Sequence, residues 1–364
     1  MNDGQHVRQL TGLRFFAAFW VVVYAYWRNL DVDWTSTFIG KGYLGVELFF
    51  VLSGFILCHV YRTSVEDGSF RYGAFLWNRL ARVYPLHLAT MAGIGALGLA
   101  AAVAGMNIDS TIVSWPSLPA NLLMVHAWGL APEAGWNHPS WSISAEWFAY
   151  LSFPLFAWAI LRLKERPLIA MAGAVIFMMA LYVGFERLTG YPLTSATYKW
   201  GALRIVPCFA YGCALHAFWR ARPAKNSTAS ALVGVAAALI LAISLASFGA
   251  PDAVIVPSLG IVILALGRLG QTGSNLLGSP TLVYLGEISY SVYMVAIPWQ
   301  LVFVNAAAKL FQLNDKQLPL WLWLVYILTV VPLAAASYHL IEHPARERMK
   351  LMAKAWRMRR PKAA

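Results

Sequence analysis

Three arginines occupy positions at which guanidinium groups could bind phosphate. Arg14 stands near the start of an apolar segment, and Arg79 and Arg82 stand three residues apart just before another such segment. Residues three apart share one face of a helix, and paired guanidinium groups bind phosphate through forked hydrogen bonds. The sequence has no Walker loop, and Gly93, Gly95 and Gly98, which have GxGxxG spacing, stand within an apolar segment where they are expected to let helices approach closely and not to bind a ligand. We therefore expect Arg14, Arg79 and Arg82, together with Tyr84 in the same segment, to hold a nucleotide-bearing ligand.

Carboxylates form the second group of chemically capable residues. Glu146 follows Trp141 and Ser142, and Tyr150 lies four residues further along the same helix face. A carboxylate so placed either orients or deprotonates a hydroxyl group, or pairs with Arg204 across a helix bundle, and both roles remain open. The residues expected to contact a hydroxyl-bearing acceptor are Glu47, Trp141, Ser142, Tyr150 and Arg204.

Histidine is the usual general base for acyl transfer at neutral pH. The sequence has eight histidines, and all of them fall in expected loops or near expected membrane interfaces. Each one alone fits a polar interface role better than a catalytic role. The absence of an HxxxxD pair argues against the glycerolipid acyltransferases that work at a soluble face.

The composition requires membrane helices to position these groups. Of the 364 residues, 59% are hydrophobic and only 12% are charged, whereas soluble proteins carry about 25% charged residues. The 16 Trp and 16 Tyr residues suit membrane interfaces. An ordinary soluble enzyme and a disordered chain are both excluded. The three cysteines, without a CxxC spacing, indicate neither a disulfide framework nor a metal site.

A hydrocarbon core about 30 Å thick requires roughly 20 apolar residues per helix. Ten segments qualify: 12–30, 42–61, 86–106, 142–163, 168–185, 199–217, 228–248, 252–268, 284–308 and 319–342. The predicted fold is therefore all-α, a polytopic transmembrane helix bundle of about ten spans. The first segment lacks a small-x-small cleavage site, so we expect it to remain as a span and not to be removed as a signal peptide.

Most of the 28 Lys and Arg residues fall in loops on the side of the N-terminus. The positive-inside rule then places both termini in the cytoplasm, and it offers the three arginines an alternative role as surface anchors. Residues 1–343 are predicted to form the membrane domain. Residues 344–364 are predicted to form a basic cytoplasmic tail that contacts anionic membrane lipids and not nucleic acid.

Two connections are expected to be longer than turns. Residues 62–85 are polar and basic and are predicted to lie on the cytoplasmic side. Residues 107–141 are predicted to lie outside, and their apolar piece at 118–130 is too short to cross the membrane. That piece is expected to be re-entrant or interfacial.

Six short motifs follow one another along the chain in a specific order and spacing. They are Leu13-Arg14-Phe-Phe, Gly45-Val-Glu47-Leu-Phe-Phe, Arg79-Leu-Ala-Arg82-Val-Tyr84-Pro85, Asn137-His-Pro-Ser-Trp141-Ser, Leu285-Gly-Glu-Ile-Ser-Tyr290 and Tyr338-His-Leu-Ile-Glu342. This combination resembles the acyltransferase-3 family of bacterial membrane O-acyltransferases, which includes O-antigen, exopolysaccharide and nodulation-factor acetylases. The resemblance implies a ten-span core in the bacterial inner membrane. It also implies cytoplasmic acyl-CoA, in particular acetyl-CoA, as the donor and a glycan or glycolipid as the outer acceptor.

The resemblance further implies two histidines that this chain lacks. The family has an arginine, ten residues and then a histidine, but Ala25 stands at that place after Arg14. Ala296 stands where the family commonly has a histidine two residues before a proline. On a helix, Arg14 and Ala25 share a face about 16 Å apart, which suits a pantetheine arm. With Glu146, these alanines mark the expected catalytic positions. We hypothesise an engineered histidine-to-alanine variant that binds acyl-CoA and turns over slowly.

Two other functions remain open at this point. A transporter or flippase for a glycan or a lipid-linked sugar needs no catalytic base, so alanine at both positions favours it if the sequence is natural. Such a transporter has no reason to bind CoA. The second alternative is the other large class of membrane-bound O-acyltransferases, with His126 or His216 as a deep base. The sequence does not specify the acceptor, the acyl length or the oligomeric state.

Overall fold

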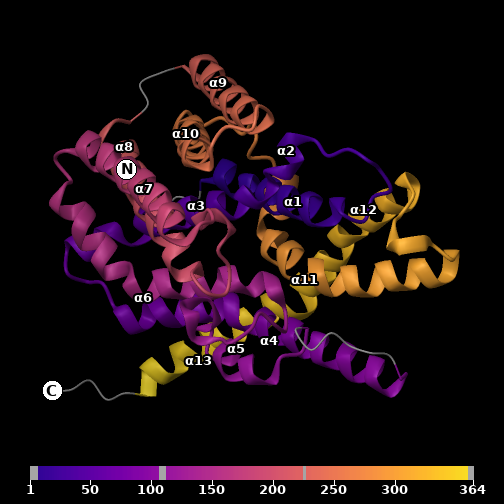
Figure 1. The fold of residues 1–364 in the computed structure, drawn as a ribbon. Coiled ribbons are helices and arrows are strands. Elements are labelled where there is room, and N and C mark those ends of the chain that lie inside the picture. The colour runs from indigo at the N-terminus through magenta and orange to yellow at the C-terminus, as the bar shows by residue number, and fades with distance from the viewer. Residues whose placement is uncertain (1–6, 106–111, 224–226, 360–364) are drawn as a thin grey trace.

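The computed structural model describes residues 7–105, 112–223 and 227–359, and these form an all-helical bundle (Figure 1). Ten of its helices are long and apolar enough to cross a membrane, which confirms the predicted number of candidate spans. The long helices are α1 (Arg8–Trp27), α3 (Gly45–Glu66), α4 (Tyr72–Val103), α6 (Trp141–Arg162), α7 (Pro167–Thr189), α8 (Gly201–Ala221), α9 (Thr228–Ser247), α10 (Asp252–Gln271), α11 (Pro280–Phe311) and α12 (Leu320–Ser337).

The third span begins earlier than the sequence predicts. Instead of a long polar connection over 62–85, α3 continues to Glu66 and α4 already begins at Tyr72. The prediction was wrong because it treated Arg79 and Arg82 as loop charges. Both side chains line an internal cavity from within α4, so their charge does not interrupt the helix.

The connection predicted to lie outside contains only short helices among its described residues, 112–140. Helix α5 (Leu118–Leu122) and the helical turn η3 (His126–Leu130) are each too short to span a bilayer, as predicted. Residues 107–111 of this stretch lie outside the described part of the chain.

The C-terminal stretch predicted to be a tail is helical. A turn at Tyr338–Glu342 leads from α12 into α13 (His343–Arg359), and α13 packs against α4. The Trp77 indole N–H donates a hydrogen bond to the Met349 carbonyl oxygen over 2.8 Å. Residues 360–364, which include the last basic positions of the predicted tail, lie outside the described residues.

Two helix pairs form the closest contacts in the bundle. In the pair α3–α8, a Cβ atom at Gly54 would collide with the Phe209 carbonyl oxygen, and one at Gly212 with that of Val51. In the pair α1–α11, a Cβ atom at Gly286 would collide with the backbone of Thr11. Small residues thus let these backbones touch, which is a common basis of helix association in membranes.

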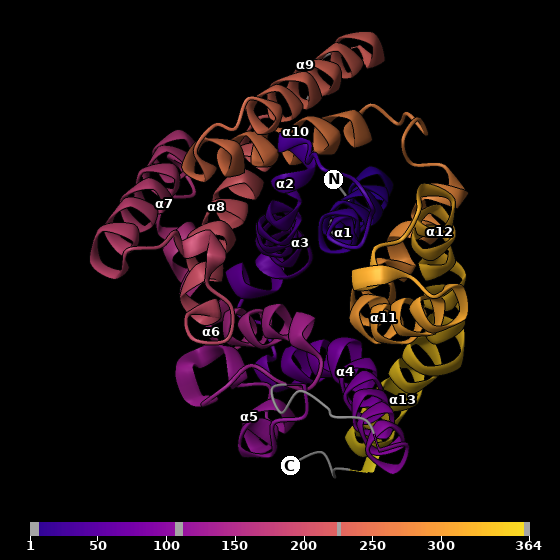
Figure 2. The ribbon, with the colours of Figure 1, turned by 45° about the vertical axis from the view of Figure 1, so that its right-hand side comes forward.

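Helices α1 and α3 lie in the centre of the bundle. Figure 2 shows α6, α7 and α8 on one side of them, α11, α12 and α13 on the other, and α9 with α10 along a third edge. The apolar interior is correspondingly divided into a large cluster around α3 and α8 and a smaller one between α1, α11 and α12. Several helices can therefore send polar side chains toward the space beside α1 and α3.

Candidate active site

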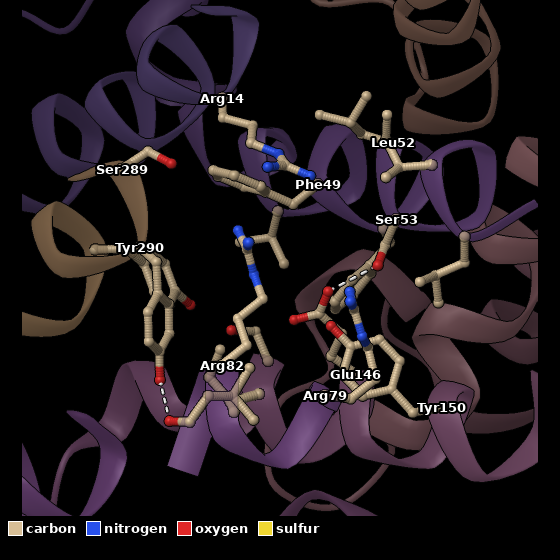
Figure 3. A pocket seen from close by; sticks show the side chains of 18 residues that line it. Arg14, Phe49, Leu52, Ser53, Arg79, Arg82, Glu146, Tyr150, Ser289 and Tyr290 are labelled. Carbon is tan, nitrogen blue, oxygen red and sulfur yellow. Dashed lines mark hydrogen bonds between the residues drawn. The ribbon is translucent and has the colours of Figure 1, made fainter. Parts of the chain in front are cut away.

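One cavity is lined by the chemically capable residues of three separate sequence motifs. Arg14 of α1, Arg79 and Arg82 of α4, and Glu146 and Tyr150 of α6 all line a cavity of about 80 Å³. In Figure 3, Arg14 enters from α1 at the top and Arg82 from α4 below, while Glu146, Arg79 and Tyr150 lie together on one side. The arginines expected to bind the donor and the residues Glu146 and Tyr150, expected to act on or contact the acceptor, therefore line one and the same cavity.

Helical spacing explains how each element contributes its side chains. Arg79 and Arg82 are three residues apart on α4, and Glu146 and Tyr150 are four apart on α6, so each pair projects from one helix face. Both predictions of a shared face are confirmed, because all four side chains line the same cavity.

The Glu146 carboxylate is held by a serine. The Ser53 hydroxyl of α3 donates a 2.7 Å hydrogen bond to Glu146 Oε1, which fixes one carboxylate oxygen at the cavity wall. Opposite it, the Tyr290 hydroxyl of α11 donates to the Val83 carbonyl oxygen over 2.6 Å and ties α11 to α4. Hydrogen bonds thus position side chains on both sides of the cavity.

Positive charge exceeds negative charge in the cavity lining. Arg14, Arg79 and Arg82 face one lining carboxylate, that of Glu146. Among the described residues, none of these three guanidinium groups forms an ion pair within 4.0 Å, and Arg79 Nε is buried without a hydrogen-bond partner. Partly buried charge of one sign is costly unless an opposite charge compensates it. The cavity is therefore suited to an anionic ligand.

Glu47 and Arg204 form a separate buried ion pair. Arg204 Nη2 donates to Glu47 Oε2 over 2.9 Å, and Arg204 Nε donates to Glu47 Oε1. The guanidinium group also lies 4.6 Å from the centre of the Trp141 ring and donates to the Ala196 carbonyl oxygen. The predicted possibility that Arg204 pairs with Glu146 is wrong, because Glu47 already binds the guanidinium in a bidentate fork.

The remaining predicted site residues divide between the cavity and its surroundings. Ser142 lines the cavity, and its hydroxyl donates to the Pro139 carbonyl oxygen over 3.1 Å. The Tyr84 hydroxyl instead donates to the Leu122 carbonyl oxygen over 3.0 Å and connects α4 to α5. Glu47, Trp141, Tyr84 and Arg204 are not among the residues that line the cavity.

Comparison with known proteins decides the family. A model of the acyltransferase-3 family, described as an acyltransferase domain, matches residues 7–339. The chain belongs to the acyltransferase-3 family. The acyltransferase MdmB of Streptomyces mycarofaciens is 31% identical over 312 residues, which cover 79% of this chain and 77% of that protein.

A second relative is longer than this chain. The O-acetyltransferase OatA of Staphylococcus aureus is 24% identical over 378 aligned positions. The alignment covers 96% of this chain but 58% of the length of OatA. No solved structure matches the chain. As a member of the acyltransferase-3 family with ten candidate spans and bacterial relatives, the protein is a multi-pass membrane acyltransferase.

Ala25 and Ala296, the two alanines predicted to mark catalytic positions, lie outside the arginine cavity. Ala296 is buried and Ala25 is half-buried in the apolar cluster between α1, α11 and α12. The Tyr26 hydroxyl donates to the Ala296 carbonyl oxygen over 2.7 Å, so the helix turns that carry the two alanines are adjacent. The structure therefore brings both motif positions together beside the same tyrosine.

Several lining residues were not predicted as site residues. Ser53, Tyr290 and Tyr293 all line the cavity and stand within or directly beside the family motifs. Ser289 lines it as well, one residue before Tyr290. Their positions in the motifs were the available sign that they belong to the site. The sequence around a hydroxyl group on an apolar helix does not show which neighbouring helix that group faces.

Histidines are absent from the described cavity lining. His87, His126 and His216 are nevertheless buried, which differs from the polar interface role expected for them. The rings of His87 and His126 stack with centres 5.8 Å apart, and His126 Nε2 lies 3.0 Å from Ser140 Oγ. Burial lowers the pKa of His126 to about 3, so this imidazole is neutral at physiological pH.

Proposed function

We propose that this acyltransferase moves an acyl group, in particular acetyl, from cytoplasmic acyl-CoA to a hydroxyl group of a glycan or glycolipid on the outer side of the bacterial inner membrane. The observation that carries the proposal is the convergence of Arg14, Arg79, Arg82 and Glu146 on one cavity. The names of the relatives support it, since one is an acyltransferase and another an O-acetyltransferase.

The arginines are the proposed contacts for the phosphate groups of the donor. Guanidinium groups bind phosphate through charge-assisted forked hydrogen bonds, and the lining has more positive than negative charge. A cavity of about 80 Å³ is much smaller than typical ligand pockets of about 300–1,000 Å³. The donor is therefore expected to enter only in part and to widen the site as it binds.

The proposed reaction is attack of an acceptor oxygen on the thioester carbonyl carbon. The new C–O ester bond forms, the C–S bond breaks, and the acceptor proton passes through a base to the departing CoA sulfur. In the family this base is implied to be a histidine at the place of Ala25, supported by one at the place of Ala296. Without them, general base catalysis worth about 10²–10⁴ in rate is lost.

A restoration experiment tests the proposal. Membranes containing the protein or its Ala25→His, Ala296→His double variant are incubated with radiolabelled acetyl-CoA, and label in extracted glycan and glycolipid is counted. The variant is expected to transfer label about 10²-fold faster or more. Retained CoA binding by the purified variant shows that it is folded. A folded variant with no gain in transfer would contradict the assignment of these positions.

The second candidate function is transport of a glycan or a lipid-linked sugar without chemistry. The two alanines in otherwise intact motifs favour it. Thermal unfolding of the purified protein in nanodiscs separates the two functions, because CoA stabilises a protein that binds it. A clear rise in melting temperature with CoA supports the acyltransferase. An unchanged melting temperature at millimolar CoA supports transport.

A further inference from the structure

A second hollow lies on the other side of α1. It has a volume of about 460 Å³ and is bounded by α1, α9 and α10, with α2 (Thr37–Gly40) and α3 contributing at its margins. Leu13, Ala17 and Trp20 of α1 line it, whereas Arg14 of the same helix lines the arginine cavity. Helix α1 is thus the wall between a charged cavity and this second hollow, which we call the α1–α9 groove.

The α1–α9 groove is apolar along almost its whole lining. Among the described lining residues, Gln9 is the one with an amide or charged side chain. The Trp20 indole N–H is already satisfied, because it donates to the Phe38 carbonyl oxygen over 3.0 Å. Apart from Gln9 at one end, the side chains of this wall offer a polar ligand no free donor or acceptor, so the groove suits hydrocarbon.

The α1–α9 groove is open to the surroundings of the protein. Phe16 is 53% exposed and Ile243 is 48% exposed, although both line the groove. Because α1, α9 and α10 are candidate membrane spans, such an opening faces lipid chains and not water. The exposed apolar side chains then have a natural partner in the bilayer.

The dimensions of the α1–α9 groove match a lipid chain that lies along a helix. On α1 the lining runs from Gln9 to Val23, a distance of about 21 Å at 1.5 Å per residue. This exceeds half of a hydrocarbon core about 30 Å thick. The groove follows the helix axis, as a lipid tail standing in a leaflet does.

Polar groups stand at one end of the groove. The Gln9 amide donates to the Ser274 carbonyl oxygen over 2.6 Å, and Arg8 Nη1 lies 3.5 Å from Asn275 Oδ1. This is the end predicted to be cytoplasmic from the distribution of Lys and Arg. A partly exposed arginine there supplies the charge that attracts an anionic headgroup.

We propose that the α1–α9 groove binds one acyl chain of an anionic phospholipid from the cytoplasmic leaflet, with the headgroup phosphate beside Arg8. The lipid covers the exposed part of the groove and supports the face of α1 opposite Arg14. This site does not depend on the proposed acyl transfer, and its test measures lipid binding alone.

A pair of substitutions on one helix provides the first test. Ala242 is buried and lines the groove, whereas Ile240 is 66% exposed and does not line it. Native mass spectrometry then measures phosphatidylglycerol retained by each purified variant. Ala242→Trp fills the groove and is expected to weaken retention at least about tenfold, because several methylene groups lose their contacts. Ile240→Trp is expected to retain lipid as the parent does, and equal retention by both variants would overturn the proposal.

Photo-crosslinking of the unaltered protein gives an independent result if Ala242→Trp does not fold. Phosphatidylglycerol with a diazirine in one acyl chain is expected to label groove residues such as Phe16, Trp20 and Leu239. Labelling confined to positions outside the groove, such as Ile240, would overturn the proposal. Arg8→Gln is expected to lower the preference for phosphatidylglycerol over phosphatidylcholine about fivefold. An unchanged preference would overturn the assignment of the headgroup.

Discussion

At the level of single residues, buried charge is handled in two different ways in this protein. Glu47 and Arg204 satisfy each other in a bidentate ion pair. The three cavity arginines have no such partner within 4.0 Å among the described residues. The Glu47–Arg204 pair holds two helices together, whereas the unpaired arginines of the cavity are available to a ligand.

Replacement of Arg14 tests the role of the unpaired arginines. Arg14→Ala is expected to weaken CoA binding about 10–100-fold, since hydrogen bonds to a charged group contribute about 1.5–3 kcal/mol. Isothermal titration of the purified protein with CoA measures the affinity. Arg162→Ala, at the exposed end of α6, serves as the control and is expected to leave it unchanged. Equal affinities for all three proteins would refute the phosphate assignment.

Replacement of one member of the Glu47–Arg204 pair is expected to destabilise the protein. Glu47→Leu leaves an unpaired buried guanidinium and should cost about 3–5 kcal/mol, whereas Glu47→Leu with Arg204→Leu should recover most of the loss. Thermal unfolding in nanodiscs measures both variants. Lys350→Ala, which removes an exposed ion pair with Glu347, is the control and should leave the melting temperature nearly unchanged, because water and salt screen exposed charges. A double variant no more stable than the single one would contradict this role.

Helical spacing made part of the site predictable at the residue scale. The pairs Arg79–Arg82 and Glu146–Tyr150 follow from periodicity along one helix, so the sequence correctly placed each pair on one face. The partners of Arg204 and Glu146 depend on which helices meet. No local feature of the sequence distinguishes Glu47 from Glu146 as the partner of Arg204. Pairing of Arg204 with Glu146 was one of two roles left open for that carboxylate, and the fold pairs Arg204 with Glu47 instead.

At the level of elements, helix contacts through glycine determine how closely the central pairs approach. The backbones of α3 and α8 meet at Gly54 and Gly212, and those of α1 and α11 meet at Gly286. These contacts place Ser53 and Arg14, each near one of the two interfaces, at the cavity wall. Glycines on the same helices thus help to set the geometry of the site, because they let the helix backbones touch.

Gly212→Ala is expected to disturb this arrangement. Its Cβ atom would collide with the Val51 carbonyl oxygen, so α3 and α8 must separate at a cost of about 1–3 kcal/mol or more. Gly173→Ala in α7 is the matched control, because its Cβ atom meets nothing within 4 Å, and it should stabilise its helix by up to about 1 kcal/mol. Melting temperatures that fall equally in both variants would rule out close approach as the cause.

The start of α4 shows where the prediction of helix boundaries from hydropathy fails. The ten spans were predictable because each has enough apolar residues in a row. Arg79 and Arg82 lower the hydropathy of the first turns of α4, yet they face a cavity and not lipid. Average hydropathy does not distinguish these two environments, so the predicted boundary fell 14 residues after Tyr72.

At the level of the whole molecule, the distribution of basic residues predicts that both termini face the cytoplasm. Cysteine labelling in bacterial spheroplasts tests this orientation, since the native cysteines are buried. The exposed positions Thr35, between α1 and α3, and Asp67, directly after α3, lie on opposite predicted sides of the membrane. Thr35→Cys should react with a membrane-impermeant maleimide at once, and Asp67→Cys only after permeabilisation. The reverse order of labelling would invert the predicted topology.

The Glu47–Arg204 pair also bears on biogenesis. An arginine within a membrane helix raises the free energy of insertion through the translocon, and Arg204 stands in the first turn of α8. Its carboxylate partner lies 157 residues earlier in the chain and is synthesised first. Helix α8 thus gains its neutralising partner only if α3 remains nearby while the intervening helices are being made. The ion pair that joins the finished bundle consequently imposes an order on its co-translational assembly.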